Sequence, residues 1–530
     1  MCTPQQGVWS ILCGALTYAA LATSALAQAP YQQVPAGKLG VPNDAPVLTT
    51  YPVAQQPAQV TIDHETLQKI VRDEIQADKA KALPETKSTA DDRSLSAKWD
   101  NGFVAQTADK AFRIHLGGRF EFDNTWFTQD ANILLGTSNT QRLIDGSLFR
   151  RARLRADGTM WDWIDFAVEV NFANIQDASN VQDQPVQVGS VGLNDMFLTF
   201  REVPIVGNLR VGHLQAPVGL ERLSSSNAWY YMERSSIYDA FLGPNDYQNG
   251  IMAFDSYFDD RVTLAASFTR VGKSTVQSFG FDAEDGAYAG AARLTCLPYY
   301  DCDGRYLMHL GAGYQHAALV GDQFAVANRP LLRSGSGFGS DTPNVVATGT
   351  YFTPDGADIA DFEWATVLGP FSLSAEYAFA HVSNVFDTFN GLTFAGPHGD
   401  VTYQAAYAEG GFFLTGENRR YDKKTGTWAR TIPTNNVINP MDNCDCITGC
   451  GAVQLVARYT YLDLVSGDPV LSQTSGARAG RQHDMTLGVN WYLNPQVWIM
   501  ANYILTHVDS TVPGASGDFQ GFGVRVHVDF

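Results

Sequence analysis

The segment "FRRARLRADGTMWDWIDFAVEVNF", residues 149–172, alternates in polarity on both sides of a central break. After the break one parity is apolar, with Ile164, Phe166, Val168, Val170 and Phe172, and the other holds Asp165, Ala167, Glu169 and Asn171. Before it, Leu148, Ala152, Leu154 and Ala156 oppose Arg151, Arg153 and Arg155. Because successive side chains of a β-strand point to opposite faces, the pattern predicts two strands joined by a turn at Asp157-Gly158. Each strand has one apolar face and one charged face.

The same two-residue period continues to the end of the chain. It recurs in "FRIHLGGRFEFDNTWF" (112–127), "RVTLAASFTR" (261–270), "FSLSAEYAF" (371–379), "VQLVARYTYL" (453–462), "MTLGVNWYLNPQVWIMANYIL" (485–505) and "GFGVRVHVDF" (521–530). Tight turns are predicted at Gly369-Pro370 and Leu493-Asn494-Pro495. Longer loops rich in Gly, Asp and Ser are predicted at 215–247, 273–303, 317–360 and 415–450. Short turns at one end and long loops at the other are typical of a transmembrane β-barrel.

Aromatic residues near the predicted turns favour the barrel over a soluble β-sandwich or β-propeller, which would also alternate. Trp161, Trp163, Tyr492, Trp498 and Tyr503 are predicted to form an interfacial girdle. The terminal strand carries Phe522, Val524, Val526, Val528 and Phe530 on one parity, and the chain ends on Phe530, which is typical of bacterial outer-membrane proteins. About 430 barrel residues at roughly 27 per strand predict sixteen antiparallel strands, although eighteen would also fit.

The composition restricts the class of protein. No stretch beyond the N-terminus shows about 18 consecutive apolar residues, which argues against a helical membrane span. The formal net charge is −19, which argues against nucleic acid as a partner and complicates any simple account of anion transport. Ten histidines are scattered without a G-x-S-x-G, H-E-x-x-H or P-loop motif, so neither an enzyme nor a cofactor is predicted.

The N-terminal hundred residues divide into segments of different character. Residues 1–27 read as a cleaved export signal, with Ala25-Leu26-Ala27 as an A-x-A site, so the protein is predicted to reach the bacterial outer membrane. Residues 28–59 are a Pro- and Gln-rich linker, and 60–83 carry an amphipathic helical stripe. A lone helix of this kind favours a trimeric coiled coil, with a frayed helix as the alternative. A second linker, 84–108, would precede the barrel domain, 109–530.

Five cysteines would remain after signal cleavage, in "CLPYYDC" (296–302) and "CDCITGC" (444–450). In an oxidising compartment they predict loop disulfides, such as Cys296–Cys302, with one thiol left over. A metal site is not predicted, because neither cluster contains histidine and the spacing fits no zinc pattern.

Several segments, taken in order, resemble the phosphate-selective porins O and P. The resemblance is carried by "LGGRFEFD", the opening segment, "LRVGHLQAPVGLERLSSSNAWYYMERS", "EGGFFLTGENRRYDKKTG", "LGVNWYLNPQVWIMANYILTHVD" and the terminal "RVHVDF", over about residues 110–530. It implies a sixteen-stranded trimeric pore with inward-folded loops. It also implies an arginine ladder that guides anions to a basic constriction.

The ladder is placed here residue by residue. Arg119 in "GGRF" and Arg150-Arg151 in "FRRA" match the resemblance, and parity supports a lumen position for Arg119 and Arg151. Arg150 falls on the lipid parity, so it must lie near a strand end, at a bulge, or reach the interface. The full set of expected anion-selectivity residues is Arg119, Arg150, Arg151, Arg153, Arg222, Arg234, Arg458 and Arg525. Each could instead be an arginine paired with a lumen carboxylate.

The resemblance and the residues together predict an outer-membrane porin for passive uptake of small anions, phosphate or polyphosphate above all. Glu221, Arg222, Glu233 and Arg234 balance one another in the predicted constriction element. Asp165, Glu169, Asp195 and Glu376 add acids to the inner face, so a general diffusion pore without phosphate preference stays open. A structural or adhesive barrel with a closed lumen is the further alternative.

Overall fold

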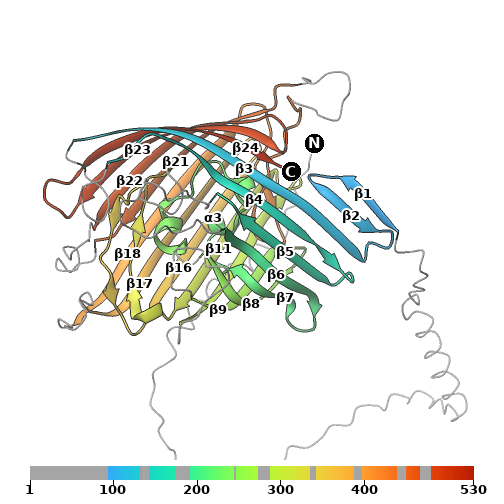
Figure 1. Cartoon of the computed structure of the whole chain (residues 1–530), viewed down its shortest axis with the longest axis horizontal. Helices are drawn as coiled ribbons and strands as arrows, with labels where there is room; N and C mark the ends of the chain where they lie inside the picture. The colour runs from blue at the N-terminus through green and yellow to red at the C-terminus, as the bar shows by residue number, and fades with distance from the viewer. Residues whose placement is uncertain are drawn as a thin grey trace, which may run out of the picture. The chain divides into compact units, whose positions relative to one another are not determined.

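The computed structural model describes residues 94–131, 133, 142–173, 191–243, 246–271, 287–334, 342–386, 397–437, 449–465 and 479–530. Within them, sixteen long strands form one antiparallel ring (Figure 1). The strands are β3 (Phe112–Gln129), β4 (Gly146–Met160), β5 (Ile164–Asn171), β6 (Gly192–Val203), β7 (Gly207–Gln215), β8 (Tyr247–Tyr257), β9 (Val262–Arg270), β10 (Tyr288–Asp301), β11 (Tyr306–Ala317), β16 (Ala357–Leu368), β17 (Phe371–Phe386), β18 (Pro397–Phe413), β21 (Ala452–Asp463), β22 (Gly480–Tyr492), β23 (Val497–Ser510) and β24 (Gly517–Asp529).

The ring closes between its last strand and its first. β24 pairs with β3 from Phe519↔Gln129 to Asp529↔Arg119, and every other neighbour in the ring is also an antiparallel partner. Closure leaves no open edge among these strands, so their backbone groups are bonded without help from water. The predicted sixteen-stranded barrel is confirmed. The predicted helix 60–83 and the segments before it lie outside the described residues.

The two-residue period separates the outer face of the barrel from its lumen. On β24 the outward Phe522 and Val526 are 43% and 41% exposed, whereas the inward Arg525 is 2% exposed. Apolar side chains on the outer face of a closed barrel match a hydrocarbon surround. Among the described residues, no helix has the length and apolar character needed to cross a membrane.

The turn predicted at Asp157-Gly158 is wrong. Both residues lie within β4, and the chain reverses at Trp161–Trp163, where Trp161 and Asp162 have φ values of 53° and 64°. Gly158 serves close packing instead, because a Cβ there would lie 1.9 Å from the backbone oxygen of Arg113 on β3. The turns predicted at 369–370 and 493–495 are confirmed.

The predicted aromatic girdle is partly wrong. Trp161, Trp163 and Tyr503 are 57%, 50% and 37% exposed, as expected of outward rings. Tyr492 and Trp498 are only 3% and 1% exposed, and they pair directly across the β22–β23 turn on the inner face. Nearness to a turn does not decide the face, whereas strand parity does.

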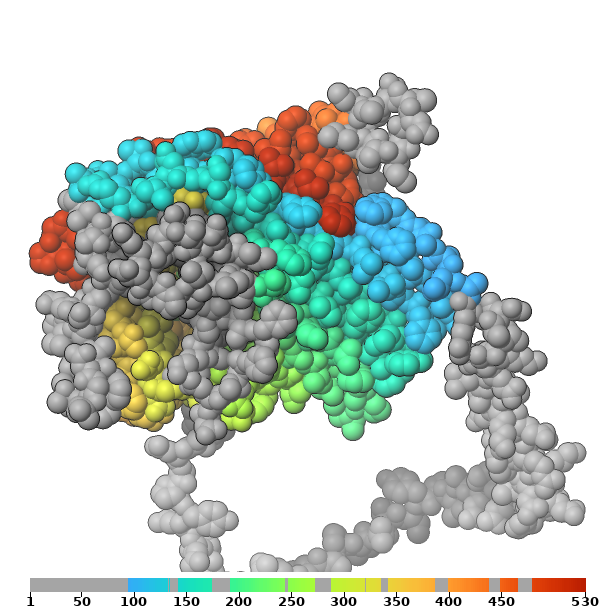
Figure 2. Space-filling model, viewed as in Figure 1, coloured from blue at the N-terminus to red at the C-terminus, as the bar shows by residue number. Residues whose placement is uncertain are grey.

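A short hairpin extends the sheet along β3, beyond the end of the closing seam. β1 (Leu95–Trp99) pairs with β2 (Phe103–Thr107), and β2 pairs with β3 from Phe103↔Leu116 to Gln106↔Arg113. These residues lie in the range expected to be a linker. β2 therefore occupies the edge of β3 that β24 vacates, beside the end of the chain (Figure 2).

Among the residues that the structure describes, three connections fold into the barrel. The first lumen segment (216–243 and 246) contains α3 (Leu220–Leu223), a 3-10 turn (Ser226–Ala228) and a π-helical turn (Tyr238–Leu242). The second (318–334 and 342–356) contains β12 (Gln323–Phe324), β13 (Ala327–Asn328), β14 (Val346–Ala347) and β15 (Tyr351–Phe352). The third (414–437) contains β19 (Arg420–Asp422) and β20 (Thr427–Ala429). Apolar side chains of the first two segments, such as Met232 and Leu332, pack with inward residues of the wall.

The third lumen segment departs from the rule of long loops at one end. It joins the end of β18 to the start of β21, on the same end of the barrel as the short turns before β5, β7 and β17. Its tip contacts the wall near the start of β9, where a Cβ on Gly426 would meet the side chains of Thr295 and Thr263. This long loop therefore enters the pore from the end with the short turns.

The expected disulfide Cys296–Cys302 does not form. Cys302 is disulfide-bonded, whereas Cys296 and Cys450 keep their thiols. Cys296 lies within β10, opposite Leu310 of β11, and Cys302 lies in the turn beyond that strand. The two residues therefore do not share one loop, which was the basis of the expectation.

Candidate pore site, a cavity rich in arginine

A cavity of about 1270 Å³ occupies the lumen between the wall from β3 to β9 and the three lumen segments. Eleven arginine or lysine side chains and eight carboxylate side chains line it, an excess of three positive charges when the histidines are neutral. The cations are Arg119, Arg150, Arg151, Arg153, Arg155, Arg210, Arg234, Arg293, Arg329, Lys424 and Arg430. The cavity is thus cationic inside a chain whose net charge is −19.

Two arginines on neighbouring strands share one carboxylate in the wall. Arg119 on β3 lies directly opposite Arg153 on β4. Glu169 of β5 accepts from Arg153 at 2.9 Å and from Arg119 at 3.3 Å, and it also accepts from the Asn194 amide at 2.8 Å. Two guanidinium groups facing one carboxylate leave a local excess of positive charge.

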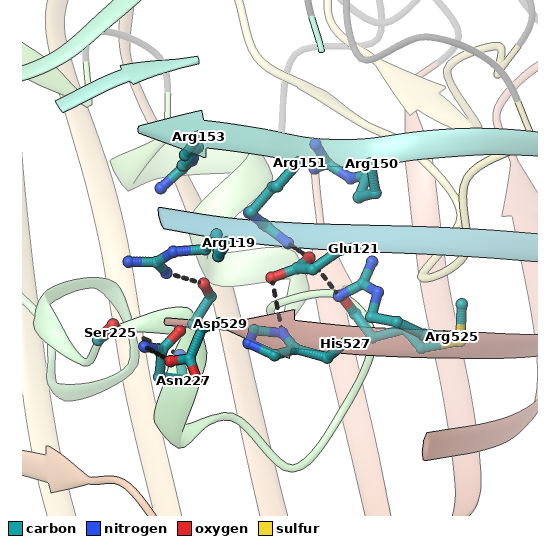
Figure 3. A network of polar contacts seen from close by, with 12 residues as sticks. Arg119, Glu121, Arg150, Arg151, Arg153, Ser225, Asn227, Arg525, His527 and Asp529 are labelled. Atoms are coloured by element: carbon teal, nitrogen blue, oxygen red, sulfur yellow. Dashed lines mark hydrogen bonds and ion pairs between the residues drawn. The ribbon is translucent and has the colours of Figure 1, made fainter. Parts of the chain in front are cut away.

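A β-bulge turns Arg150 into the lumen. The register of β3 and β4 shifts between Glu121↔Arg151 and Phe122↔Phe149, which leaves Arg150 as the extra residue. Arg150 and Arg151 consequently both point inward, next to Glu121 and Arg525 (Figure 3). Of the three placements that parity allowed for Arg150, the bulge is confirmed.

Glu233 fixes the first lumen segment to the wall. Its carboxylate accepts two bonds from Arg150, at 2.7 and 2.9 Å, and one from Arg525 at 3.1 Å. Burial raises the pKa of Glu233, but Arg150, Arg333 and Arg525 lower it by more, so this pKa lies well below its usual range. The carboxylate is therefore ionised at neutral pH and holds the loop through charge-assisted bonds.

Backbone groups beside Glu233 are held by three further strands. The Met232 N–H donates to Asn502 of β23 at 2.8 Å, and the Tyr230 oxygen accepts from Asn490 of β22 at 2.9 Å. The Glu233 oxygen accepts from Arg458 of β21 at 2.9 Å. Residues 230–233 are therefore tied to the inner face of the barrel along their whole length.

The expected anion-selectivity residues divide into two groups. Five line the cavity, namely Arg119, Arg150, Arg151, Arg153 and Arg234. The other three do not line it and bind protein groups instead: Arg222 pairs with Asp246 at 3.0 Å, Arg458 with Glu221 at 3.1 Å, and Arg525 with Asp123 at 2.7 Å. Those three arginines are anchors of the loop and the wall.

The sequence reasoning missed several cavity cations, of which Arg210 and Lys424 are the most informative. Arg210 on β7 stacks on Phe197 at 3.9 Å and on Phe254 at 5.0 Å, and it bonds to Thr199 at 3.1 Å. Lys424 is exposed at the tip of the third lumen segment. Neither side chain forms an ion pair with any residue that the structure describes. Alternating polarity in "LRVGH" could have found Arg210, because Leu209 and Val211 flank it.

The remaining cavity cations carry a nearby acid. Arg155 pairs with Asp195 at 2.7 Å, Arg430 with Asp529, and Arg151 with Glu121. Arg234 stacks between Trp229 and Tyr238, with its guanidinium 4.3 and 4.0 Å from the two ring centres. Most of the cavity cations are therefore paired and two are not, an arrangement that can attract an anion without enclosing it.

Known proteins are similar to the chain at several levels. Porin O of Pseudomonas aeruginosa is 25% identical over 459 residues, which covers 83% of this chain and 93% of that protein. Among solved structures, the outer membrane channel DcaP of Acinetobacter baumannii covers 80% of this chain and 99% of its own, at 13% identity and a TM-score of 0.46. The anion-selective porin from Comamonas acidovorans covers 79% and 99%, at 12% identity and a TM-score of 0.43.

The family match extends over the whole barrel and the hairpin before it. Residues 95–530 match the family described as phosphate-selective porin O and P, from the first residue of β1 to the last residue of the chain. The closed barrel, its apolar outer face and its charged cavity agree with a channel of the outer membrane. The chain therefore belongs to the phosphate-selective porin O and P family.

Proposed function

We propose that the protein is a water-filled channel through which small anions, phosphate or polyphosphate above all, enter passively. The observation that carries the proposal is the excess of positive charge in the cavity. Arg119 and Arg153 place two positive charges around the single carboxylate of Glu169. Arg210 and Lys424 each add one further positive charge. An ion in a narrow lumen has lost part of its hydration and faces a low-dielectric wall, so a few unbalanced charges set its preference.

Arginine suits an oxyanion because the guanidinium stays charged and offers a planar fork to two oxygens. In the cavity each fork already bonds to a carboxylate or stacks on a ring, so a passing anion replaces only part of these contacts. Binding is then strong enough to admit the anion and weak enough to release it. The preference for phosphate over other anions is supported by the description of the family, phosphate-selective porin O and P.

The partners follow from the same reading. Outer-membrane lipid is the proposed surround of the barrel, and the exposed Phe522, Leu505 and Phe362 on the outer face support it. A homotrimer is proposed from the family and from the amphipathic stripe at 60–83, which would join three chains. Detergent-solubilised protein is expected to elute at the mass of three chains, as measured by light scattering. A monomer that stays monomeric at every detergent concentration would contradict this part.

Planar lipid bilayers test the proposed function. The purified protein is expected to show discrete conductance steps and, in a KCl gradient, a reversal potential of the sign for anion preference. Arg210→Gln and Lys424→Gln are each expected to lower the anion-to-cation permeability ratio on the order of tenfold. One charge about 8 Å from an ion contributes roughly 1–2 kcal/mol at the intermediate dielectric of a pore.

The matched control is Arg481→Gln, which removes a charge from the outward side of β22, where Arg481 pairs with Asp463 at 2.9 Å. Its reversal potential should equal that of the unchanged protein. A clear cation preference of the unchanged protein would contradict the proposal. The absence of conductance steps would indicate a closed structural barrel.

A general diffusion pore is the second candidate, and the carboxylates of the cavity favour it. Asp157, Glu169, Asp195 and Asp255 line the same wall as the arginines. Opposed acids and bases create a transverse field that disfavours apolar solutes and admits polar solutes of either charge. Titrating phosphate against the chloride current separates the two, because only a phosphate-preferring pore shows a saturating block.

A further inference from the structure

An apolar patch interrupts the polar inner face of the barrel on the neighbouring strands β6, β7 and β8 (Figure 1). Phe197 of β6 points into the lumen, because the residues on either side of it, Met196 and Leu198, are outward and 51% and 41% exposed. Phe254 and Met252 of β8 also line the cavity. The interior of a water-filled barrel is normally polar, so residues that break this rule are candidates for a function.

Arg210 of β7 lies at the centre of this patch. Its direct cross-strand partners are Thr199 on β6 and Met252 on β8. Phe197 and Phe254 are its diagonal neighbours, with ring centres 3.9 and 5.0 Å from the guanidinium carbon. The patch therefore joins one cation to two aromatic rings on one face of the sheet.

The guanidinium of Arg210 is held in place and still keeps most of its donors. Its Nε donates to the Thr199 hydroxyl at 3.1 Å, and stacking on the rings fixes the plane of the group. The two terminal nitrogens are not enclosed by protein, and they bond to no residue that the structure describes. A planar fork with free donors therefore faces the cavity.

The acids on the neighbouring part of the wall are balanced by other arginines. Asp195 of β6 pairs with Arg155 at 2.7 Å. Asp165 of β5 pairs with Arg201 at 3.3 Å. The charge of Arg210 is therefore left for a species in the cavity.

Small residues leave room beside both rings. Gly212 lies opposite Phe197, where a Cβ would come within 3.0 Å of the Phe197 Cβ. Ala265 of β9 lies opposite Phe254, and both rings are partly exposed. The tip of the third lumen segment approaches Thr263, which is two residues from Ala265 on the same face of β9. An apolar surface and a cation thus lie side by side at the edge of the cavity.

We infer that Arg210, Phe197 and Phe254 form a subsite for organic anions that carry an aromatic ring, with aromatic carboxylates as the class. A carboxylate presents two oxygens to the guanidinium fork, and its ring packs on Phe254, which Arg210 covers less closely than Phe197. Inorganic phosphate uses the fork alone and gains nothing from the rings. The inference rests on the proposed channel and extends its solutes to aromatic anions.

Block of the KCl current in planar lipid bilayers tests the inference. Benzoate, acetate and benzamide are added in turn to the unchanged channel, because acetate has the charge without the ring and benzamide has the ring without the charge. Benzoate is expected to halve the current at a concentration about tenfold below that of acetate, which is the effect of covering one face of a ring. Benzamide is expected to produce no block in that range.

Two variants assign the effect to the patch, and each is judged by the ratio of the half-blocking concentrations of acetate and benzoate. Phe254→Ser is expected to bring the ratio close to one, because it removes a ring and keeps the stacking of Arg210 on Phe197. Arg210→Gln is expected to abolish the block by benzoate. The matched control is Phe352→Ser, on β15 outside the cavity lining, which should keep the ratio of the unchanged channel.

Equal half-blocking concentrations of benzoate and acetate in an anion-preferring channel overturn the inference and leave the proposed channel standing. So does a block by benzamide as strong as that by benzoate, or a Phe254→Ser channel that keeps the full ratio. A cation preference in KCl contradicts the proposed channel instead.

A binding measurement decides the inference without relying on conduction. Radiolabelled benzoate is dialysed to equilibrium against the detergent-solubilised protein, with detergent alone as the reference. Saturable binding that unlabelled benzoate displaces and acetate does not displace is the expected result. The absence of saturable binding overturns the inference.

Discussion

Glu233→Gln is expected to destabilise the folded barrel by about 3–5 kcal/mol and to make the open channel flicker. Breaking a buried ion pair by neutralising one partner leaves the other charge uncompensated. Here two arginines, Arg150 and Arg525, would lose their common carboxylate. Urea or guanidinium unfolding gives the stability difference, and single-channel recording gives the excess current noise.

The control for this substitution is Glu202→Gln, which neutralises an exposed residue near the end of β6. It should change neither the free energy of unfolding nor the noise. If Glu233→Gln were as stable and as quiet as Glu202→Gln, the first lumen segment would be held by its backbone bonds alone.

The pH dependence of the noise follows from the lowered pKa of Glu233. A carboxylate whose folded pKa is depressed contributes stability that is present above the unfolded pKa, about 4.3, and is lost as the pH falls through the folded pKa. Noise in the unchanged channel should therefore be constant from neutral pH down to about pH 4 and rise only in stronger acid. The Glu233→Gln channel should be noisy at every pH.

The double substitution Arg119→Gln/Arg153→Gln is expected to abolish anion preference and to bring the channel close to cation preference. It removes two positive charges and leaves Glu169 with Asn194 and with Arg155, whose guanidinium lies 3.8 Å away. At the intermediate dielectric of the pore, each lost charge contributes roughly 1–2 kcal/mol to the energy of a nearby ion. The reversal potential in a KCl gradient should move toward the potassium equilibrium value.

Glu169→Gln changes the charge of the same wall in the opposite direction. Neutralising the shared carboxylate raises the positive excess, so anion preference should increase while the two arginines stay in place. If Glu169→Gln and the double substitution shifted the reversal potential in the same direction, damage to the barrel, and not charge, would control selectivity.

Strand parity predicted the barrel, its closure and the inward direction of most of its arginines, because lipid outside and water inside impose one physical rule on every strand. It placed Arg119, Arg151 and Arg153 correctly in the lumen. For Arg150 it left three placements open, of which the structure shows the bulge on β4. The outward and inward faces of a membrane-spanning strand can therefore be predicted from a single sequence.

Contacts between distant segments could not be predicted in this way. Parity cannot show that Arg458 and Arg525 face a folded loop instead of open water, because that depends on how the loop around Glu233 packs. The turn at Trp161-Asp162 was missed because Asp-Gly is the commoner hairpin signal, whereas here Gly158 permits close approach of β3. The importance of Arg210 was missed because it comes from the lack of an acid partner. That lack depends on which side chains three neighbouring strands place around the guanidinium.

The final residue of the chain is part of the barrel seam. Phe530 exchanges two backbone hydrogen bonds with Gly118 on β3, at 2.7 and 3.0 Å, directly beside the hairpin that begins the sheet. The seam between β24 and β3 can therefore be completed only after residues up to Phe530 have been exported. A peptide tag fused after Phe530 would have to leave between β24 and β2, so insertion into the membrane should tolerate additions at the long loops better than at this terminus.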